Sequence, residues 1–280
     1  MNHDYSLAHL TALNLSPPEL VEAAAAAGYR YVGLRLNRVA PSDPYYPLVS
    51  DRALMKETQA RLADTGVEVL DIELARLAPE DEPEEFLPML EAGATLGARH
   101  VIGQLPDPVA SRKAERFARL CDLARPFGLT IDLEFPSWTE TGDLTSATQV
   151  MRAADRPNAG ILIDTLHFAR SNSSAEELAR LPREWFRYAH VCDAPREIPA
   201  TREGLIRTAR LERLFPGEGG IDVQGILAAL PAGIPYALEI PRVTLSTLVG
   251  EKECARLALR AARMHLDTPD AVAGAALAAH

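Results

Sequence analysis

The stretch LTIDLEF (residues 129–135), continued by SATQVMRAADRP (146–157) and GILIDT (160–165), decides the fold of this 280-residue chain. The first and third segments are short, apolar runs of the kind that form strands. The segment between them has a helical pattern. A strand, a helix and a second strand in this order predict two parallel neighbours in one sheet, joined by a right-handed crossover.

The same alternation extends in both directions along the chain. Further strands are expected at residues 5–10, 29–36, 67–74, 98–104, 187–192 and 236–240. Further helices are expected at residues 17–28, 51–66, 82–97, 109–128, 174–181, 222–231 and 249–266. Eight strands separated by helices predict an α/β protein, specifically a closed (β/α)8 TIM barrel. A doubly wound open sheet is the alternative, but no GxGxxG turn follows the first strand.

Composition narrows the classes of function. The chain is 47% hydrophobic and has a net charge of −10, without a basic block, so tight binding to nucleic acid is not expected. No stretch approaches the roughly 18 apolar residues of a membrane helix. The alanine-rich end, residues 270–280, is too short to span a bilayer and is expected to be a frayed last helix. No linker or change in composition divides the chain, which favours one domain over residues 1–280.

The cysteines and the first residues indicate a compartment. Cys121, Cys192 and Cys254 are an odd number without CxxC spacing, which is typical of reduced thiols and not of a disulfide framework. The first fifteen residues carry His and Asp early and lack the basic and apolar regions of a signal peptide. These features predict a cytoplasmic protein.

Four metal-competent side chains stand at the ends of apolar, strand-like runs: Glu134, Asp164, His190 and Glu239. In a TIM barrel the carboxyl ends of the strands meet at one mouth, where active sites lie. A single charge buried there would be costly, so it needs a cation or a partner. Three carboxylates and one imidazole predict a site for one divalent metal ion, with Mn²⁺ favoured and Mg²⁺, Co²⁺ or Zn²⁺ as alternatives.

Other residues are expected near the same mouth. Two long segments, 37–50 and 193–222, follow strands and are expected to overhang it as lids, with disordered surface loops as the alternative. Arg35 and Glu73 end neighbouring strands and are expected to pair with each other. Trp138 is expected either to form an apolar wall for a sugar ring or to pack in the core.

Five short motifs carry a resemblance to a known family. They are IDLEF with Glu134, IDTLH with Asp164 and His167, HVCDAPR with His190 and Arg196, the PGEGGID loop, and ALEIPR with Glu239. Over nearly its whole length the chain resembles the xylose isomerase-like TIM barrel superfamily. The similar group within it comprises sugar phosphate isomerases and epimerases, with tagatose-type epimerases, hydroxypyruvate isomerase and inosose dehydratase.

The resemblance implies a metal site and a substrate site. It assigns Glu134, Asp164, His190 and Glu239 as metal ligands, and it assigns His167 and Arg196 as contacts to substrate. It also implies that the substrate is a small sugar or a hydroxy-ketone derived from a polyol. Barrels of this group often pair, so a homodimer is compatible with the resemblance.

The chemistry expected of such a site is isomerisation or epimerisation through a metal-stabilised enediolate. Glu134 and Glu239 flank the substrate as the catalytic residues, one removing the proton beside the carbonyl and the other returning it. Loss of a β-hydroxyl from the same intermediate would make the enzyme a dehydratase, which is the main alternative. Pro136 stands where some dehydratases that make aromatic acids place a catalytic His, which argues against dehydroshikimate dehydration.

Two further functions are weaker alternatives. Endonuclease IV-like nucleases share the expected barrel and use three zinc ions, but the strands that carry their extra histidines end here in Glu73 and Gln104. A non-catalytic sugar-binding barrel is the other alternative, and survival of the whole ligand set argues against it.

Overall fold

The computed structural model describes residues 3–41 and 43–267 of the chain. The end at residues 270–280, expected to be a frayed helix, lies outside the described residues. The strands are β1 (Tyr5–Leu7), β2 (Tyr31–Arg35), β3 (Glu68–Arg76), β4 (His100–Gln104), β5 (Thr130–Leu133), β6 (Ala159–Ile161), β7 (Ile163–Asp164), β8 (Ala189–Val191) and β9 (Tyr236–Leu238). They form one sheet in the order β6-β5-β4-β3-β2-β1-β9-β8-β7, and the pairings between neighbours are parallel.

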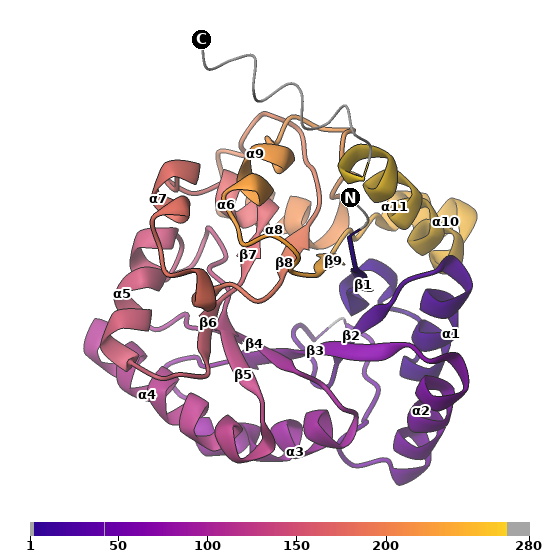
Figure 1. Cartoon of the computed structure of the whole chain (residues 1–280), viewed down its shortest axis with the longest axis horizontal. Helices are drawn as coiled ribbons and strands as arrows, with labels where there is room; N and C mark the ends of the chain where they lie inside the picture. The colour runs from indigo at the N-terminus through magenta and orange to yellow at the C-terminus, as the bar shows by residue number, and fades with distance from the viewer. Residues whose placement is uncertain (1–2, 42, 268–280) are drawn as a thin grey trace.

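The two ends of this sheet come from one stretch of chain. β6 pairs with β5 and β7 pairs with β8, and only Leu162 separates them in sequence. The backbone N–H of Leu162 still donates to the carbonyl of Leu133, the last residue of β5. β6 and β7 are therefore two halves of the expected strand at 160–165, which passes from one neighbour to the other and closes the barrel (Figure 1). The predicted (β/α)8 TIM barrel is confirmed.

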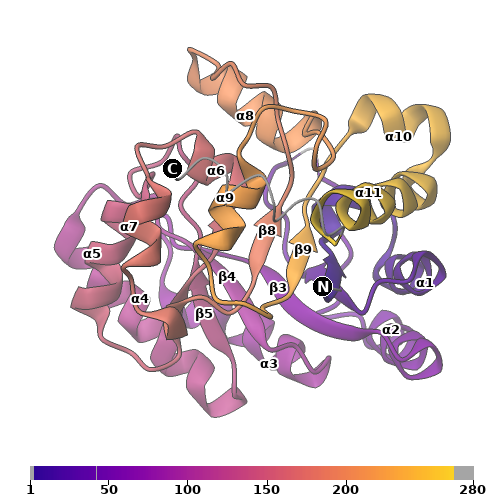
Figure 2. The same ribbon diagram turned by 45° about the horizontal axis from the view of Figure 1, so that its top comes forward.

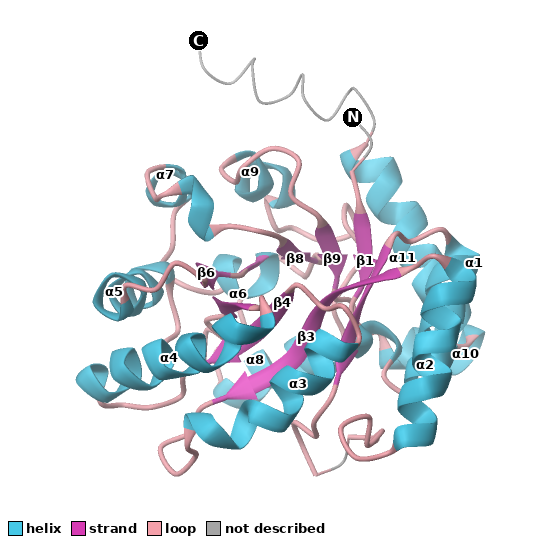
Figure 3. Cartoon of the chain, turned by 60° about the horizontal axis from the view of Figure 1, so that its bottom comes forward, coloured by secondary structure: helices cyan, strands magenta, loops and turns pink. Residues whose placement is uncertain are grey.

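Helices surround this barrel on its outside, as Figures 1 and 3 show. They are α1 (Pro17–Ala27), α2 (Arg52–Thr65), α3 (Leu87–Thr95), α4 (Ala110–Ala124), α5 (Leu144–Ala154), α6 (Thr165–Ala169), α7 (Ala175–Ala179), α8 (Arg202–Leu211), α9 (Val223–Ala228), α10 (Val243–Val249) and α11 (Glu251–Leu266). Each expected helix is present, although several are shorter than expected. Three short helices were not expected: α6, α8 and α10. Each lies between elements that the sequence patterns predicted.

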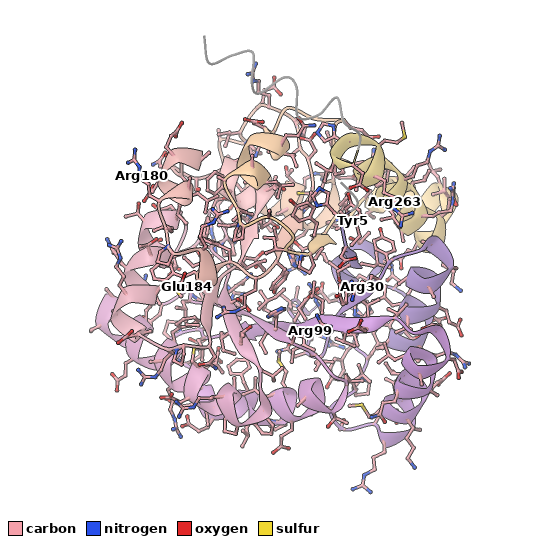
Figure 4. All side chains as sticks on the ribbon, in the orientation of Figure 1. Tyr5, Arg30, Arg99, Arg180, Glu184 and Arg263 are labelled. Atoms are coloured by element: carbon pink, nitrogen blue, oxygen red, sulfur yellow. The ribbon has the colours of Figure 1, made fainter. Side chains whose placement is uncertain are left out.

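Packing between helices and strands explains why the helical patterns could be recognised in the sequence. In α4 the buried residues Phe117, Leu120, Cys121 and Ala124 recur every three or four positions and face the sheet. Side chains also fill the space inside the ring of strands (Figure 4). All three cysteines are buried and none forms a disulfide, as expected. None of the described helices is long and apolar enough to cross a bilayer.

The two ends of the barrel differ in chemistry. Just before β2 and β4 begin, Arg30 and Arg99 both pack on the ring of Tyr31, with their guanidinium carbons 5.0 and 5.1 Å from its centroid. Both arginines also pair with Glu68. Arg30 and Arg99 are labelled near the centre of Figure 4, so this end is covered by ordinary surface ion pairs.

At the other end the two long segments after β2 and β8 come together. The segment 193–222 contains α8, which projects beyond the strand ends in Figure 2. Asp43, in the segment 37–50, accepts hydrogen bonds from Arg210 of α8 at 2.7 and 2.8 Å. The same carboxylate lies 3.5 Å from Nη1 of Arg35 in β2. Both segments therefore contribute ordered cover to this end of the barrel.

Candidate metal centre

Neighbouring strands bring the four expected ligands to one level. Asp164 is the last residue of β7 and is paired in register with His190 of β8. Glu239 follows β9 directly, and Glu134 follows β5 directly. Because parallel strands end at the same edge of a barrel, these four side chains converge there although they are far apart in sequence.

The distances within this set are short. One ligand atom from each of the four residues lies within 4.8 Å of every other, and all four side chains are buried. Nδ1 of His190 is 3.5 Å from Oε2 of Glu239 and 4.0 Å from Oδ2 of Asp164. Ligand atoms on opposite sides of a divalent ion are about 4–5 Å apart, since each lies roughly 2.0–2.4 Å from it. The set therefore has the spacing of a metal site.

The hydrogen bonding of His190 supports the same fit. Its side chain is fully buried, yet neither ring nitrogen has a hydrogen-bond partner among the described residues. A buried imidazole without partners is costly, and metal coordination would satisfy one of its nitrogens. Three carboxylates with one imidazole suit Mg²⁺, Mn²⁺ or Zn²⁺, so the residues present fit a divalent ion.

A buried arginine, Arg213, holds two of these carboxylates in place. Its Nη1 lies 2.6 Å from Oδ2 of Asp164, and its Nη2 lies 2.7 Å from Oε2 of Glu239. The other oxygen of Asp164 accepts hydrogen bonds from the backbone N–H groups of Leu166 and His167 at the start of α6. Asp164 therefore also caps this short helix. Contacts of this kind fix the orientation of metal-binding carboxylates.

The surroundings give the two glutamates opposite proton affinities. Burial, followed by repulsion from Glu239 and Asp164, raises the pKa of Glu134 to about 8. Burial acts on Glu239 as well, but attraction to Arg213 and His190 outweighs it and holds the pKa of Glu239 well below its usual range. One carboxyl group can thus hold a proton near neutral pH while the other is ionised.

The imidazole titrates with these carboxylates. Burial lowers the pKa of His190, but the negative charges of Glu239, Glu134 and Asp71 outweigh burial and raise that pKa to about 10. Without a metal ion the imidazolium compensates for the carboxylates around it. A metal ion that binds His190 must displace this proton.

A cavity of about 220 Å³ opens beside the four residues. Glu134, Glu239 and His167 line it, and Nε2 of His167 is 4.0 Å from Oε1 of Glu134. Trp138 also lines it, with its ring edge-on to the ring of His167 at 4.9 Å between centroids. His167 therefore lies where a substrate contact was expected, and Trp138 forms a wall of the cavity.

Arg196 does not join this group. Its side chain is exposed, and it is not among the residues that line the cavity. The chain leaves the barrel at residues 195–198, which carries this side chain outward. Arg213, further along the same segment, contacts the metal-binding carboxylates Asp164 and Glu239 instead. A substrate contact by Arg196 stays a prediction that this geometry does not favour.

Two residues of the site were missed by sequence reasoning. Gln104, the last residue of β4, donates to Oε2 of Glu134 at 2.6 Å. Its place at a strand end was visible in the sequence and could have suggested this contact. Arg213 had no such signal, because it follows a helix in a long segment. The expected pair of Arg35 and Glu73 is confirmed, with Nε and Nη2 of Arg35 at 2.9 and 2.7 Å from Oε2 of Glu73.

Comparison with known proteins identifies the family. The model of the xylose isomerase-like TIM barrel family matches residues 21–261, most of the chain. The chain belongs to this family.

Inosose isomerase of Bacillus licheniformis is 27% identical over 157 residues, which are 52% of this chain and 54% of that protein. The 3-dehydroshikimate dehydratase of Pseudomonas aeruginosa is 27% identical over 241 residues, which are 80% of this chain and 36% of that protein. The chain thus spans about half the length, or less, of these curated relatives.

Solved structures of the family share the barrel. The IOLI protein, solved with a zinc atom, is 21% identical, with a TM-score of 0.78 over 93% of this chain and 96% of that one. D-allulose 3-epimerase from Methylomonas sp., solved with D-allulose, is 18% identical, with a TM-score of 0.67 over 92% of this chain and 95% of that one. At these identities the likeness shows a common fold.

Proposed function

We propose that this family member is a divalent-metal-dependent isomerase or epimerase of a small hydroxy-ketone derived from a sugar or polyol. The buried set of Glu134, Asp164, His190 and Glu239 carries the proposal, because its ligand atoms lie within 4.8 Å of one another. The relatives add support, since those that match include an inosose isomerase and a structure of an epimerase. A divalent ion at these residues, Mn²⁺ before Mg²⁺, Co²⁺ or Zn²⁺, would supply Lewis-acid chemistry.

The remaining chemistry falls to side chains of the chain. Glu134 and Glu239 both line the cavity and would exchange the proton on the carbon beside the substrate carbonyl. In the metal-free site the pKa of Glu134 is raised and that of Glu239 is lowered, so the two carboxyl groups differ in proton affinity, as an acid and a base in one site do. His167 would hold a substrate oxygen, because its Nδ1 is buried without a hydrogen-bond partner among the described residues.

A dehydratase acting on the same class of ketone is the second candidate. The match with 3-dehydroshikimate dehydratase favours it, because it extends over 80% of this chain, more than the 52% covered by the inosose isomerase match. The same proton removal beside the carbonyl begins both reactions. Expulsion of a β-hydroxyl, in place of proton return, would make the product a dehydrated ketone.

The proposal is tested with the metal-loaded protein in D₂O. A panel of ketoses, inososes and keto acids is incubated with it, and products are followed by NMR. Deuterium at the carbon next to the carbonyl is expected for at least one compound, and a chelator should stop its incorporation. Loss of water from that compound would decide for the dehydratase. Neither deuterium incorporation nor loss of water in any member of the panel would overturn both candidates and favour a non-catalytic sugar-binding barrel.

A further inference from the structure

The cavity beside the metal centre holds a concentration of arginine that metal binding does not require. Among the described residues that line it, five are arginines: Arg35, Arg76, Arg202, Arg210 and Arg213. The chain as a whole has 39 acidic against 29 basic residues. A general excess of basic residues therefore does not account for the arginines at this one place.

Three of these arginines already have carboxylate partners. Arg213 bridges two of the metal-binding carboxylates, as described above. Arg35 pairs with Glu73 at 2.7 Å, and Arg35 and Arg210 share Asp43 at 3.5 and 2.7 Å. The carboxylates in these pairs are buried. The three pairs are therefore fixed parts of the cavity wall.

Positive charge remains without a partner at the outer part of the cavity. In the part of the chain that the structure describes, neither Arg76 nor Arg202 has a carboxylate within ion-pair distance, and both side chains are exposed. Two guanidinium groups without a carboxylate partner in the wall of one cavity favour a negatively charged ligand there.

Two of the three arginines of helix α8 lie on the face that lines this cavity. The residues of α8 that line the cavity lie along one side of the helix: Arg202, Ile206, Ala209 and Arg210. Successive members of this set are one, three or four positions apart in the sequence. Arg207, on the same helix, is exposed and is not among the lining residues. The orientation of α8 thus directs Arg202 and Arg210 toward the cavity and Arg207 toward solvent.

We propose that the substrate carries a carboxylate, which Arg202 and Arg76 bind where they line the cavity. This inference rests on the proposed function and narrows its substrates from neutral sugars to sugar-like or cyclic keto acids. Guanidinium groups suit a carboxylate, because their paired donors match its two oxygens.

Binding is measured without turnover, by calorimetry on the Mg²⁺-loaded protein at constant ionic strength. The probes are three hydroxy acids, glycolate, gluconate and quinate, each paired with its neutral amide, together with fructose 1-phosphate and fructose 6-phosphate. At least one acid is expected to bind tenfold or more tightly than its amide, the approximate size of a charged hydrogen-bond contribution. Arg202→Gln should remove most of this difference, and Arg76→Gln should reduce it.

The matched control is Arg207→Gln, which makes the same change of charge on the solvent side of α8 and should leave the preference for acid unchanged. Equal affinity of every acid and its amide, or equal loss in Arg202→Gln and Arg207→Gln, would overturn the proposal. Tighter binding of either phosphate than of every acid would overturn the assignment to a carboxylate. A protein that binds acids through Arg202 but exchanges no substrate proton would refute the proposed function and leave this inference standing.

Discussion

Glu134 and Glu239 line one cavity from different strands, but their surroundings shift their pKa values in opposite directions. Gln104 is the hydrogen-bond donor to Glu134, whereas Arg213 and His190 surround Glu239 with positive charge. Burial, with repulsion from Glu239 and Asp164, raises the pKa of Glu134 to about 8 despite the Gln104 hydrogen bond, while Arg213 and His190 hold the pKa of Glu239 well below its usual range. Two carboxyl groups with separated pKa values are the usual basis for an acid and a base in one site.

The first prediction concerns these two residues. Glu134→Gln and Glu239→Gln should each lower the rate of solvent-deuterium incorporation by roughly 10²–10⁴-fold, the usual contribution of a general acid or base. Far-UV circular dichroism should be unchanged. Glu218→Gln is the control, because Glu218 pairs with Arg242 and does not line the cavity. Exchange at the wild-type rate in either of the first two variants would refute the assignment of that residue.

The second prediction is that metal binding releases protons. In the metal-free site the pKa of His190 is raised to about 10 and that of Glu134 to about 8, so both groups hold protons at pH 7. Metal coordination needs a neutral imidazole and a carboxylate, so affinity should rise with pH. Between pH 6 and 8 the release should approach two protons per ion, and it should fall toward one above pH 8.

Calorimetry in buffers of different ionisation enthalpy measures this release directly. His190→Asn should reduce it by about one proton, because an amide has none to lose. Metal affinity that stays constant from pH 6 to 8 would contradict this picture of the metal-free site.

At the residue scale the sequence predicted the ligand set but not its support. Glu134, Asp164, His190 and Glu239 could be chosen because each ends an apolar strand-like run, and strand position alone fixes where such a side chain points. Arg213 could not be chosen the same way. Its place depends on how a long segment folds back over the barrel, which no local pattern in the sequence determines.

At the element scale, the segment that carries Arg213 is held by its neighbours on both sides. Asp193 and Leu214 form an antiparallel bridge, and so do Glu212 and Arg242. The side-chain carboxylate of Asp193 also accepts hydrogen bonds from the backbone of the PGEGGID loop. These contacts set the position of Arg213 between the extensions of β8 and β9.

The third prediction is that Asp193→Ala destabilises the protein strongly. Its buried carboxylate accepts from the backbone N–H groups of Ala194, Gly217, Gly219 and Ile221 at 2.8–3.1 Å, and all four donors would lose their partner. The free energy of unfolding should fall by roughly 2–4 kcal/mol in urea titrations. Asp222→Ala, which removes a single capping bond to Gly225, should cost about 1 kcal/mol. Equal losses in the two variants would show that Asp193 does not organise the loop.

The elements themselves were predictable to different degrees. Long helices with a regular apolar face, such as α4, were found at nearly their observed bounds. The short helices α6 and α8 were not, because five to ten residues give too little periodicity. The division of one expected strand into β6 and β7 at Leu162 was also unforeseen, since it reflects closure of the barrel and leaves no mark in composition.

At the scale of the whole molecule, the two ends of the barrel carry different kinds of polar residues. The end where the strands begin carries exposed ion pairs such as Arg30 with Asp4, while the end where they finish gathers buried carboxylates, His190 and the arginine-lined cavity. The sequence predicted this polarity, because Glu134, Asp164, His190 and Glu239 fall at the carboxyl ends of the expected strands. It did not predict that Asp43 would join the two long segments over the cavity, since that contact spans 167 residues of sequence.

The central claim is that four strand ends hold one divalent ion, and a crystal grown with Mn²⁺ tests it most directly. Anomalous diffraction should give a single strong peak among Glu134, Asp164, His190 and Glu239, at about 2.0–2.4 Å from one oxygen of each carboxylate and from a ring nitrogen of His190. A map without a peak among these residues, at Mn²⁺ concentrations that saturate any site seen by calorimetry, would contradict the claim.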